Sequence, residues 1–469
     1  MRLLSLHSTG SKSQMCLRIY VREYEDRVVA IDESPTSAFT EGFSPDEVAS
    51  AVSNFLDTHE GLPFDNYTDL LENRSDKYRR EDAEKWFETH QPDLALDVTT
   101  VMKSRDRGSH TKAPLMTYAL LVGRDLGNGW EHTSINENQV AARNRDPNTE
   151  HDEYELTFLI PPLLDDAKNV IGLDGTPCKR QWDLCLGHSV KYWRVLTDRE
   201  RGSYIRDVLN QQIYQMSVHA KVYSSGKWVK LEKDRALIKG IGEQERMLPD
   251  LITSQKAIKQ YQDENFLNTV DEYLHYGDLI GSNQFGDSRL GIVIGSPHYG
   301  DTYLEKWGAF ANEVVKWEGG RGMDKEYDPF GNELLEEMRE SEVLQAVMRF
   351  GRDGDGAKIF VSTGAIPEWV PRAGRGKVTE YSDGMKSVLN AIEDRTEWKS
   401  SDLLTDVEGR KTPALDSENG EVLSGRRVQG HLTTLCERGF VSRNKNGNGY
   451  VYRNECVQDA PRGLFLEFE

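Results

Sequence analysis

Three long polar side chains with helical spacing, Gln345, Arg349 and Arg352, are well suited to chemistry on an anion. They lie in the segment SEVLQAVMRFGRDGDGAKIFVST, residues 341–363. Spacings of four and then three residues place the first two on one face of a helix and the third near its end. Guanidinium groups pair with phosphate oxygens, and they neutralise the charge that develops when a phosphoryl group is transferred. The alternative interpretation is a surface helix with a solvated basic edge.

Two adjacent acids, Asp32 and Glu33, follow the apolar run 28–31. A short apolar run predicts a buried strand, which places the acids at its carboxyl end. In open α/β sheets, ligands bind at the carboxyl ends of the strands. The alternative is an ordinary strand that ends in an acidic turn.

Two further strand-and-turn segments carry polar residues. NVIGLDGTP, residues 169–177, predicts a buried strand and a sharp turn that carries Asp174 and Thr176. GIVIGSP, residues 291–297, predicts another buried strand, and GSNQF precedes it with Gly281, Ser282 and Asn283.

The order of these segments resembles the motif order of superfamily 2 helicases. The sixth motif of that family usually reads Gln-x-x-Gly-Arg-x-Gly-Arg. This sequence keeps Gln345, Arg349, Gly351 and Arg352 but has Met348 where the family has glycine. The Asp-Glu strand resembles the second motif, GLDGTP the third, and GSNQF with GIVIGSP the fifth. The pattern looks like the plasmid- or virus-associated helicase-like proteins of halophilic archaea.

The resemblance implies ATP and Mg²⁺ as cofactors and DNA as the partner. It implies that Asp32 holds Mg²⁺ and that Glu33 polarises the attacking water. It implies that Gln345, Arg349 and Arg352 act on the γ-phosphate. It implies that Asp174 and Thr176 couple the nucleotide site to the nucleic acid. The residues implied to contact a nucleic-acid backbone are Gly281, Ser282 and Asn283.

The glycine-rich phosphate loop of such ATPases is missing from the sequence. Its pattern, Gly-x-x-x-x-Gly-Lys-Ser/Thr, does not occur, because Ser11 separates Gly10 from Lys12 and no buried strand is predicted before them. Only 31 residues precede Asp32. We therefore expect an N-terminally incomplete first lobe, with a second chain as one source of the missing loop.

These elements predict an α/β protein with two RecA-like lobes, the first incomplete, a mainly helical insertion and a C-terminal winged helix-turn-helix. Within the insertion, 45–57 and 78–90 are expected to be helices and 123–132 a hairpin or loop. Within the second lobe, 191–196, 219–223 and 250–254 are expected to be strands, and 254–261 a helix. The expected boundaries are 1–39 with 150–186 for the first lobe, 40–149 for the insertion, 187–375 for the second lobe and 385–469 for the winged helix.

The C-terminal region has the pattern of three helices and a hairpin. The helices are expected at 385–395, 398–407 and 424–440, with Ser424 capping the third and Gly439 ending it. An Asn-Gly turn predicts a hairpin wing over 440–454. In winged helices the third helix enters the major groove; the DNA-contacting residues would be Arg426, Arg427 and Gln429 on the helix and Arg443 and Lys445 on the wing. The alternative is a winged helix that binds protein.

Composition limits the possible environments of the protein. The chain has 469 residues and a net charge of −20, spread evenly, which is unexpected for a nucleic-acid enzyme but fits a high-salt cytoplasm. Five cysteines without a CxxC pair argue against a disulfide framework, a zinc site or an iron–sulfur cluster. No signal peptide and no apolar run of about 18 residues occurs, so a cytoplasmic protein that does not span a membrane is expected.

The sequence thus predicts a helicase-related nucleic-acid-binding protein, an ATP-dependent DNA helicase or translocase by resemblance. Whether it is an active enzyme is left open by the missing phosphate loop. The alternative function is a non-catalytic DNA-binding regulator that acts through the winged helix, and a third interpretation is a scaffold protein that binds no DNA.

Overall fold

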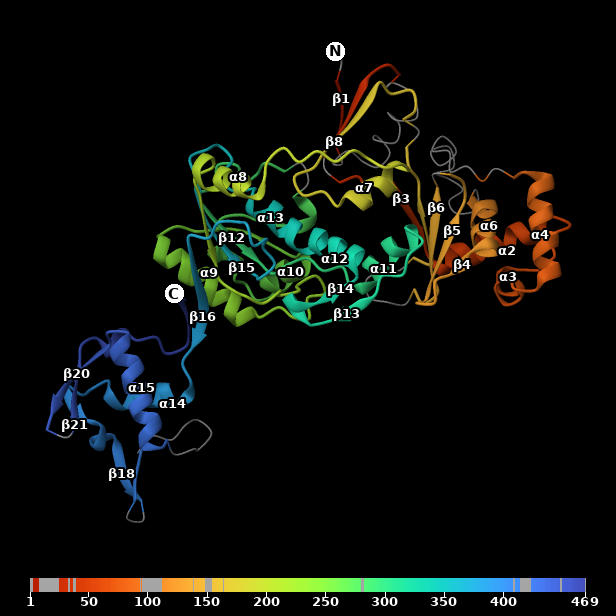
Figure 1. Cartoon of the computed structure of the whole chain (residues 1–469). Helices are drawn as coiled ribbons and strands as arrows, with labels where there is room; N and C mark the ends of the chain where they lie inside the picture. The colour runs from red at the N-terminus through yellow and green to blue at the C-terminus, as the bar shows by residue number, and fades with distance from the viewer. Residues whose placement is uncertain are drawn as a thin grey trace. The chain divides into compact units, whose positions relative to one another are not determined.

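The chain folds into a mixed α/β structure with several sheets (Figure 1). The computed structural model describes residues 3–7, 25–32, 34–36, 39–92, 94, 112–137, 139–147, 154–162, 164–279, 282–407, 410–413, 423–447 and 449–468. Two compact units form: the first comprises Met1–Val229, Asp250–Glu264 and Glu272–Ala373, and the second Lys230–Pro249, Asn265–Asp271 and Gly374–Glu469. None of the helices within the described residues has the length and apolar character needed to cross a bilayer.

A small parallel sheet in the first unit carries the predicted acidic strand. Its order is β1-β2-β8, with β1 at Leu3–His7, β2 at Val28–Asp32 and β8 at Asn169–Leu173. The strand β2 is buried as expected, whereas β1 was not expected. The prediction that β8 is buried is wrong: its apolar residues Ile171 and Leu173 are about half exposed. The apolar run correctly predicted a strand. It does not reveal that β8 lies at the edge of the sheet, where β2 is its only neighbour among the described strands.

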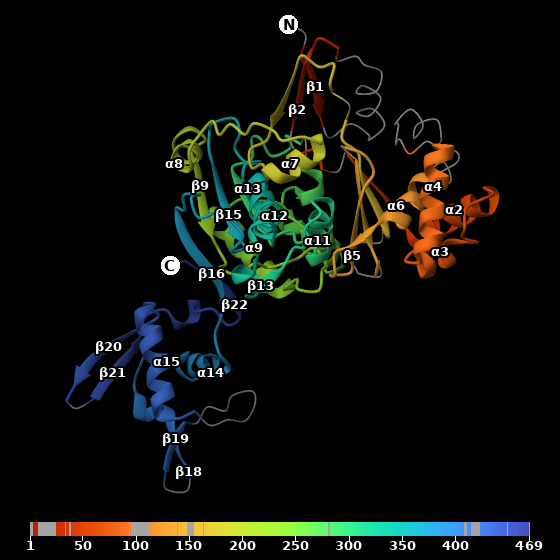
Figure 2. The same cartoon turned by 45° about the vertical axis from the view of Figure 1, so that its right-hand side comes forward.

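An antiparallel sheet that packs against helices in two separate cores follows. Its strand order is β3-β7-β6-β5-β4, at Thr40–Phe43, Leu156–Leu159, Val140–Asn144, Trp130–Ser134 and Arg124–Asp125. The helices α2, α3, α4 and α6 gather beside this sheet (Figure 2) and share one buried core with it; their bounds are Pro45–Thr58, Tyr67–Asn73, Lys77–His90 and Ala113–Val122. Helix α2 begins as predicted, where the backbone N–H of Ser44 donates to the Glu47 carboxylate over 2.9 Å.

The range 40–149, expected to be mainly helical, therefore contains most of a sheet as well. Strands β4 and β5 form the predicted hairpin, but β5 and β6 read WEHTS and VAARN and lack an apolar alternation. Buried charges replace the apolar pattern: Arg143 contacts Glu131 and Glu155 in the interior. A search for apolar periodicity misses strands of this kind.

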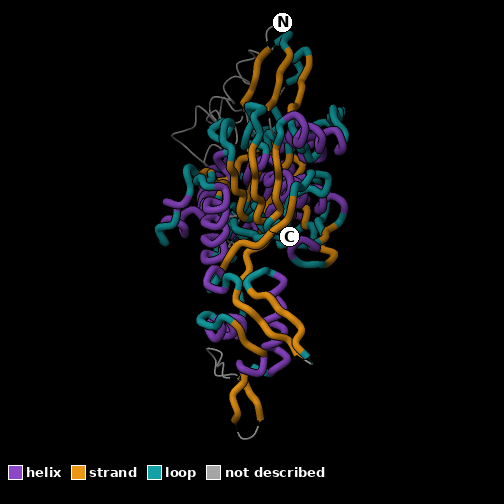
Figure 3. The backbone as a smooth tube through the Cα atoms, turned by 90° about the vertical axis from the view of Figure 1, so that its left-hand side faces the viewer, coloured by secondary structure: helices purple, strands orange, loops and turns teal. Residues whose placement is uncertain are grey.

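Five parallel strands form the main sheet of the first unit, in the order β11-β10-β12-β15-β9. Their bounds are Tyr273–His275, Asp250–Thr253, Leu290–Ile294, Ala357–Ser362 and Gln211–Gln215. The tube view shows these strands side by side (Figure 3). The predicted strands β10, β12 and β15 are confirmed, and Ser254 caps helix α10 (Gln255–Asp263). Two predictions here are wrong: 191–196 forms no strand, and 219–223 contributes only a bridge at Val222.

Helices and short turns complete the first unit. Around the pocket described below are α7, α8, the π-helical turn η2, α12, the π-helical turn η6 and α13, at Lys179–Leu186, Asp198–Ser203, Tyr204–Val208, Pro329–Glu336, Glu337–Ser341 and Glu342–Val347. The remaining elements are η4 (Tyr276–Asp278), α11 (Asp301–Phe310), β13 (Trp317–Gly319), η5 (Gly322–Asp324) and β14 (Glu326–Tyr327).

The second unit has its own core of buried apolar residues around α14 and α15. Its helices and 3₁₀ turns are α9 (Leu231–Glu245), η3 (Leu267–Thr269), α14 (Asp383–Ile392), η7 (Ser400–Leu403), α15 (Gly425–Glu437) and η8 (Val457–Asp459). Its strands are β16 (Gly374–Glu380), β17 (Glu397–Lys399), β18 (Leu404–Val407), β19 (Arg410–Pro413), β20 (Val441–Asn446), β21 (Gly449–Asn454) and β22 (Leu464–Phe468).

Most of the predicted C-terminal elements are present. Ser424 caps α15, Gly439 follows it with φ +79°, and β20 pairs with β21 as a hairpin. The predicted helix at 398–407 is wrong, because that range spans the end of β17, the turn η7 and β18. The Asp402 carboxylate accepts the backbone N–H of Lys399, so a polar turn competes with the helix here.

Candidate functional site

The segment that carries Gln345, Arg349 and Arg352 ends its helix earlier than expected. Gln345 lies on α13, but α13 ends at Val347, and both arginines lie in the turn that follows. Arg349 is 5 % exposed and donates to the carbonyl of Ser282 over 3.1 Å. Arg352 is exposed, and its Nε donates to the carbonyl of Met348. The C-cap Met348 is right-handed, and the chain then turns at Gly351, which adopts φ +59°.

The turn after β8 is held by hydrogen bonds of Asp174. Its carboxylate accepts the backbone N–H of Thr176 over 2.9 Å and the indole N–H of Trp182 over 3.0 Å. Because Trp182 lies on α7, the turn is fixed to the helix that follows it. The Thr176 hydroxyl lies on this turn and is buried without a hydrogen-bond partner among the described residues.

These two segments, about 170 residues apart in sequence, line one pocket of about 320 Å³. We call it the arginine pocket; it is lined by Asp174, Gly175, Thr176, Leu196, Arg201, Tyr204, Ile205, Leu344, Gln345, Met348, Arg349, Arg352 and Trp369. All five predicted residues of the third and sixth motif segments are among them. Three guanidinium groups and a hydroxyl at one pocket form a suitable environment for an oxyanion.

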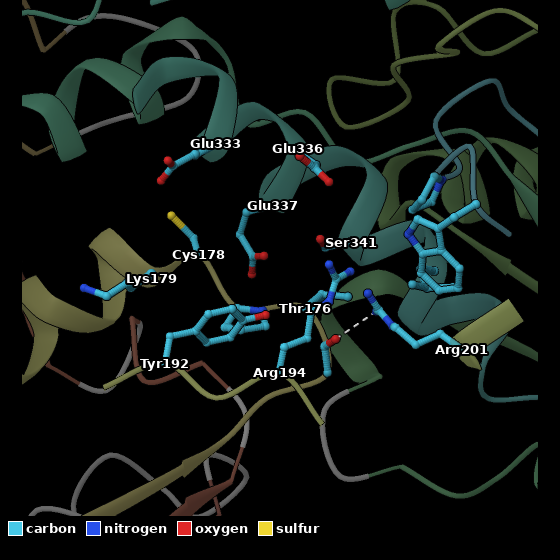
Figure 4. Close-up of a pocket in the computed structure, with 15 residues that line it drawn as sticks. Thr176, Cys178, Lys179, Tyr192, Arg194, Arg201, Glu333, Glu336, Glu337 and Ser341 are labelled. Carbon is cyan, nitrogen blue, oxygen red and sulfur yellow. Dashed lines mark hydrogen bonds between the residues drawn. The ribbon is translucent and has the colours of Figure 1, made fainter. Parts of the chain in front are cut away.

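A second hollow of about 290 Å³ adjoins the arginine pocket and shares five of its residues. We call it the acidic pocket, because Glu333, Glu336 and Glu337 line it (Figure 4). Figure 4 shows these carboxylates on the helical segment across from the chain that carries Thr176 and Tyr192. The π-helical turn η6 contributes Glu337 and Ser341 to this wall, and π-helical turns are frequent at functional sites.

Arg201 joins the two pockets. Its guanidinium donates to the carbonyl of Gly175 over 2.9 Å and lies 4.1 Å from the ring centre of Trp369. Burial lowers the pKa of Arg201 from its ordinary value of 12.5, and the neighbouring Arg194 lowers it further. An arginine remains charged at neutral pH after a modest shift of this kind. It is therefore a fixed positive charge at the boundary of the two pockets.

Glu337 is the most perturbed acid of the acidic pocket. Burial raises its pKa well above 4.5, and Asp174 and Glu342 add repulsion in the same direction. Below pH 4.5 the carboxyl is protonated in both the folded and the unfolded chain. As the pH rises past that value the unfolded chain ionises first, so the free energy of unfolding falls.

Glu337→Gln is therefore expected to stabilise the protein by about 1 kcal/mol at pH 7 and to have little effect near pH 4. Thermal unfolding between pH 4 and pH 8 measures the effect. The matched control is Glu333→Gln, an exposed carboxylate on the same wall, which should change stability by less than about 0.5 kcal/mol. A loss of stability in Glu337→Gln at pH 7 would contradict the assignment.

The other predicted residues lie outside the two pockets. Asp32 pairs in register with Leu173, one residue before Asp174, but lines neither pocket. Ser282 contacts Arg349 through its carbonyl, and Asn283 is exposed in the next turn. Glu33 and Gly281 fall outside the described residues.

The predicted DNA-contacting residues of the C-terminal region belong to the second unit. Arg426, Arg427 and Gln429 are exposed on α15, and Arg443 and Lys445 are exposed on β20. Arg443 also donates to Thr433 of α15, which ties the hairpin to the helix.

The described residues contain no group of three or more His, Cys, Asp or Glu side chains arranged to hold a metal ion. Magnesium is commonly held by one or two carboxylates together with the phosphates of its nucleotide. Asp32 is a carboxylate of the type that this role requires, but it lines neither pocket; the arginine pocket combines three guanidinium groups with the Asp174 carboxylate. The described residues include no lysine-bearing glycine loop.

Several site residues were not predicted from the sequence. Arg201, Trp369, Tyr192 and Glu337 belong to no motif, and each reaches the pockets through the fold. The one available signal is the run 184–197 before Arg201, which contains Lys191 and Arg194 and no acid in a chain that is acidic overall.

Neither a scan against protein-family models nor a search of the curated proteins returns a match for this chain. Function is therefore inferred from the residues that line the pockets.

Proposed function

We propose that this is a helicase-related nucleic-acid-binding protein whose arginine pocket receives the phosphate groups of a nucleotide, ATP in the enzymes that the sequence resembles. The observation that carries the proposal is the meeting of the Asp174–Thr176 turn with Gln345, Arg349 and Arg352 at one pocket.

The chemistry of the pocket supports phosphate binding more directly than hydrolysis. Arg201, Arg349 and Arg352 can neutralise phosphate oxygens, and Thr176 can donate a hydrogen bond. ATP would bring the transferable phosphoryl group and, with Mg²⁺, a further positive charge. Turnover would also require a phosphate loop, and we propose that a second chain supplies it when the protein acts as an ATPase or translocase.

Arg352→Ala is expected to weaken ATP binding about tenfold or more, because one charge-assisted hydrogen bond is lost from a phosphate. Arg352 is exposed, so its removal leaves the core intact. Isothermal titration of the full chain with Mg-ATP measures the affinity. The matched control is Arg206→Ala, an exposed arginine that pairs with Asp207 and lines neither pocket. Equal affinities for the two variants, or no ATP binding by the wild type at millimolar concentration, would refute the proposal.

A second candidate function is a DNA-binding regulator that acts through the second unit. The specific observation is the set of exposed cations on α15 and β20, which share one hydrogen-bonded framework. A helix with exposed arginines next to a hairpin is suited to a DNA groove and its phosphates.

The two candidates differ in how nucleotide affects DNA binding by the full chain. Nucleotide-coupled binding predicts that Mg-ATP shifts the DNA affinity, whereas a regulator predicts no shift. The full chain is required, because α9 packs against β22 within the second unit and a fragment that begins after it would lose this contact.

A further inference from the structure

An exposed run of seven residues, 191–197, leads from the acidic pocket into solvent. Every residue in it is exposed, including Tyr192 at 50 %, Trp193 at 74 % and Val195 at 83 %. Large aromatic and apolar side chains exposed together commonly mark an interaction site. The sequence pattern KYWRVL predicted a strand here, but the segment pairs with no described strand.

The sequence around these aromatic side chains is basic although the chain as a whole is acidic, while the acidic pocket beside it also carries Glu333, Glu336 and Glu337. No acid occurs from residue 184 to residue 197, although 78 of the 469 residues are Asp or Glu. Lys191 and Arg194 flank the aromatic pair, and the Lys191 Nζ lies 5.7 Å from the ring centre of Trp193. Arg194 pairs with Asp198 on the surface, and such exposed pairs contribute little and yield to a phosphate.

The run is also continuous with the pockets. Tyr192 and Arg194 line the acidic pocket, and Leu196 lines the arginine pocket. Figure 4 shows Tyr192 and Arg194 on the same side of the hollow as Thr176. A polymer bound along 191–197 would therefore pass beside the site proposed for nucleotide.

We propose that residues 191–197 bind single-stranded nucleic acid. One base stacks on Trp193, and the adjacent base stacks on Tyr192 at the edge of the acidic pocket. Lys191 and Arg194 contact the backbone phosphates. A combination of aromatic and cationic side chains is the chemistry by which proteins hold unpaired bases without sequence preference. A duplex offers no free base face, so single strands are the preferred form. The inference rests on the nucleic-acid-binding role proposed above and adds a site in the first unit, separate from α15.

Trp193→Ala is expected to weaken binding of a fluorescent 20-nucleotide oligo-dT about tenfold, measured by anisotropy with the full chain. Trp193→Phe should recover most of the affinity, since a phenyl ring still stacks. Because Trp193 is largely exposed, both variants should have the thermal unfolding midpoint of the wild type.

The matched control is Trp317→Ala, a tryptophan that is 60 % exposed on β13 and next to Glu318. It should bind oligo-dT as the wild type does. Lys191→Ala with Arg194→Ala should reduce the slope of log affinity against log salt by about 0.7 for each lost phosphate contact.

Three outcomes would overturn the inference: equal losses in the Trp193 and Trp317 variants, tighter binding of a duplex than of oligo-dT at this site, or no oligo-dT binding by the wild type. The last outcome would point to a protein partner for the exposed run. The titration with Mg-ATP tests the arginine pocket independently, so any of these outcomes would leave the proposal for ATP binding standing.

Discussion

Replacing Arg143 by methionine is expected to destabilise the first unit by about 3–5 kcal/mol, the usual cost of leaving a buried charge without its partner. The Arg143 Nε donates to Glu155 over 2.8 Å, and its Nη1 lies 3.2 Å from Glu131. The two carboxylates are only 1 % and 3 % exposed. Arg74 still contacts Glu131 in the variant, but Glu155 would keep only the hydroxyl of Tyr67.

Urea unfolding of the full chain measures this loss. Arg145→Met is the matched control, because Arg145 pairs with Asp125 over the same 2.8 Å at the surface and should contribute less than about 1 kcal/mol. Adding Glu155→Gln to the Arg143 variant should recover part of the stability, since an amide carries no charge into the interior. Equal effects at Arg143 and Arg145 would show that burial does not govern the energy of the network.

The same network explains which strands could be predicted. The apolar runs of β2, β12 and β15 identify buried strands without further information. The strands β5 and β6 bury Glu131 and Arg143 instead. These two side chains pair with each other across the strands, and Arg74 and Glu155 from other segments complete their neutralisation. The periodicity of apolar residues does not show which charged side chains are neutralised by partners elsewhere in the chain. These two strands were therefore not predicted.

The candidate site shows the same division between local and distant information. The spacing of Gln345, Arg349 and Arg352 identified residues that share a pocket, although the helix ends before the arginines. Arg201 and Trp369 could not be found in this way. They reach the pocket through the packing of α8 and of the loop after β15, and no local spacing encodes that packing.

Gly351 lies between the two arginines and determines the course of their turn. It has φ +59°, and a Cβ added to it would lie 2.9 Å from the backbone of Gly356. A left-handed conformation costs a residue with a side chain about 1–2 kcal/mol, and backbone atoms cannot move aside as a flexible side chain would. An alanine at this position must therefore either strain the turn or displace the arginines.

Gly351→Ala is accordingly expected to lose about 3 kcal/mol of stability, the sum of the left-handed strain and the steric overlap, and to weaken Mg-ATP binding. Gly354→Ala is the matched control, because Gly354 also has positive φ, +90°, but an added Cβ would meet nothing within 4 Å. It should lose only about 1–2 kcal/mol and should bind ATP as the wild type does. Urea unfolding and nucleotide titration of both variants test the argument. If the two alanines cost the same stability, the turn would be governed by backbone conformation alone, and the close contact with Gly356 would not hold Arg349 and Arg352 in place.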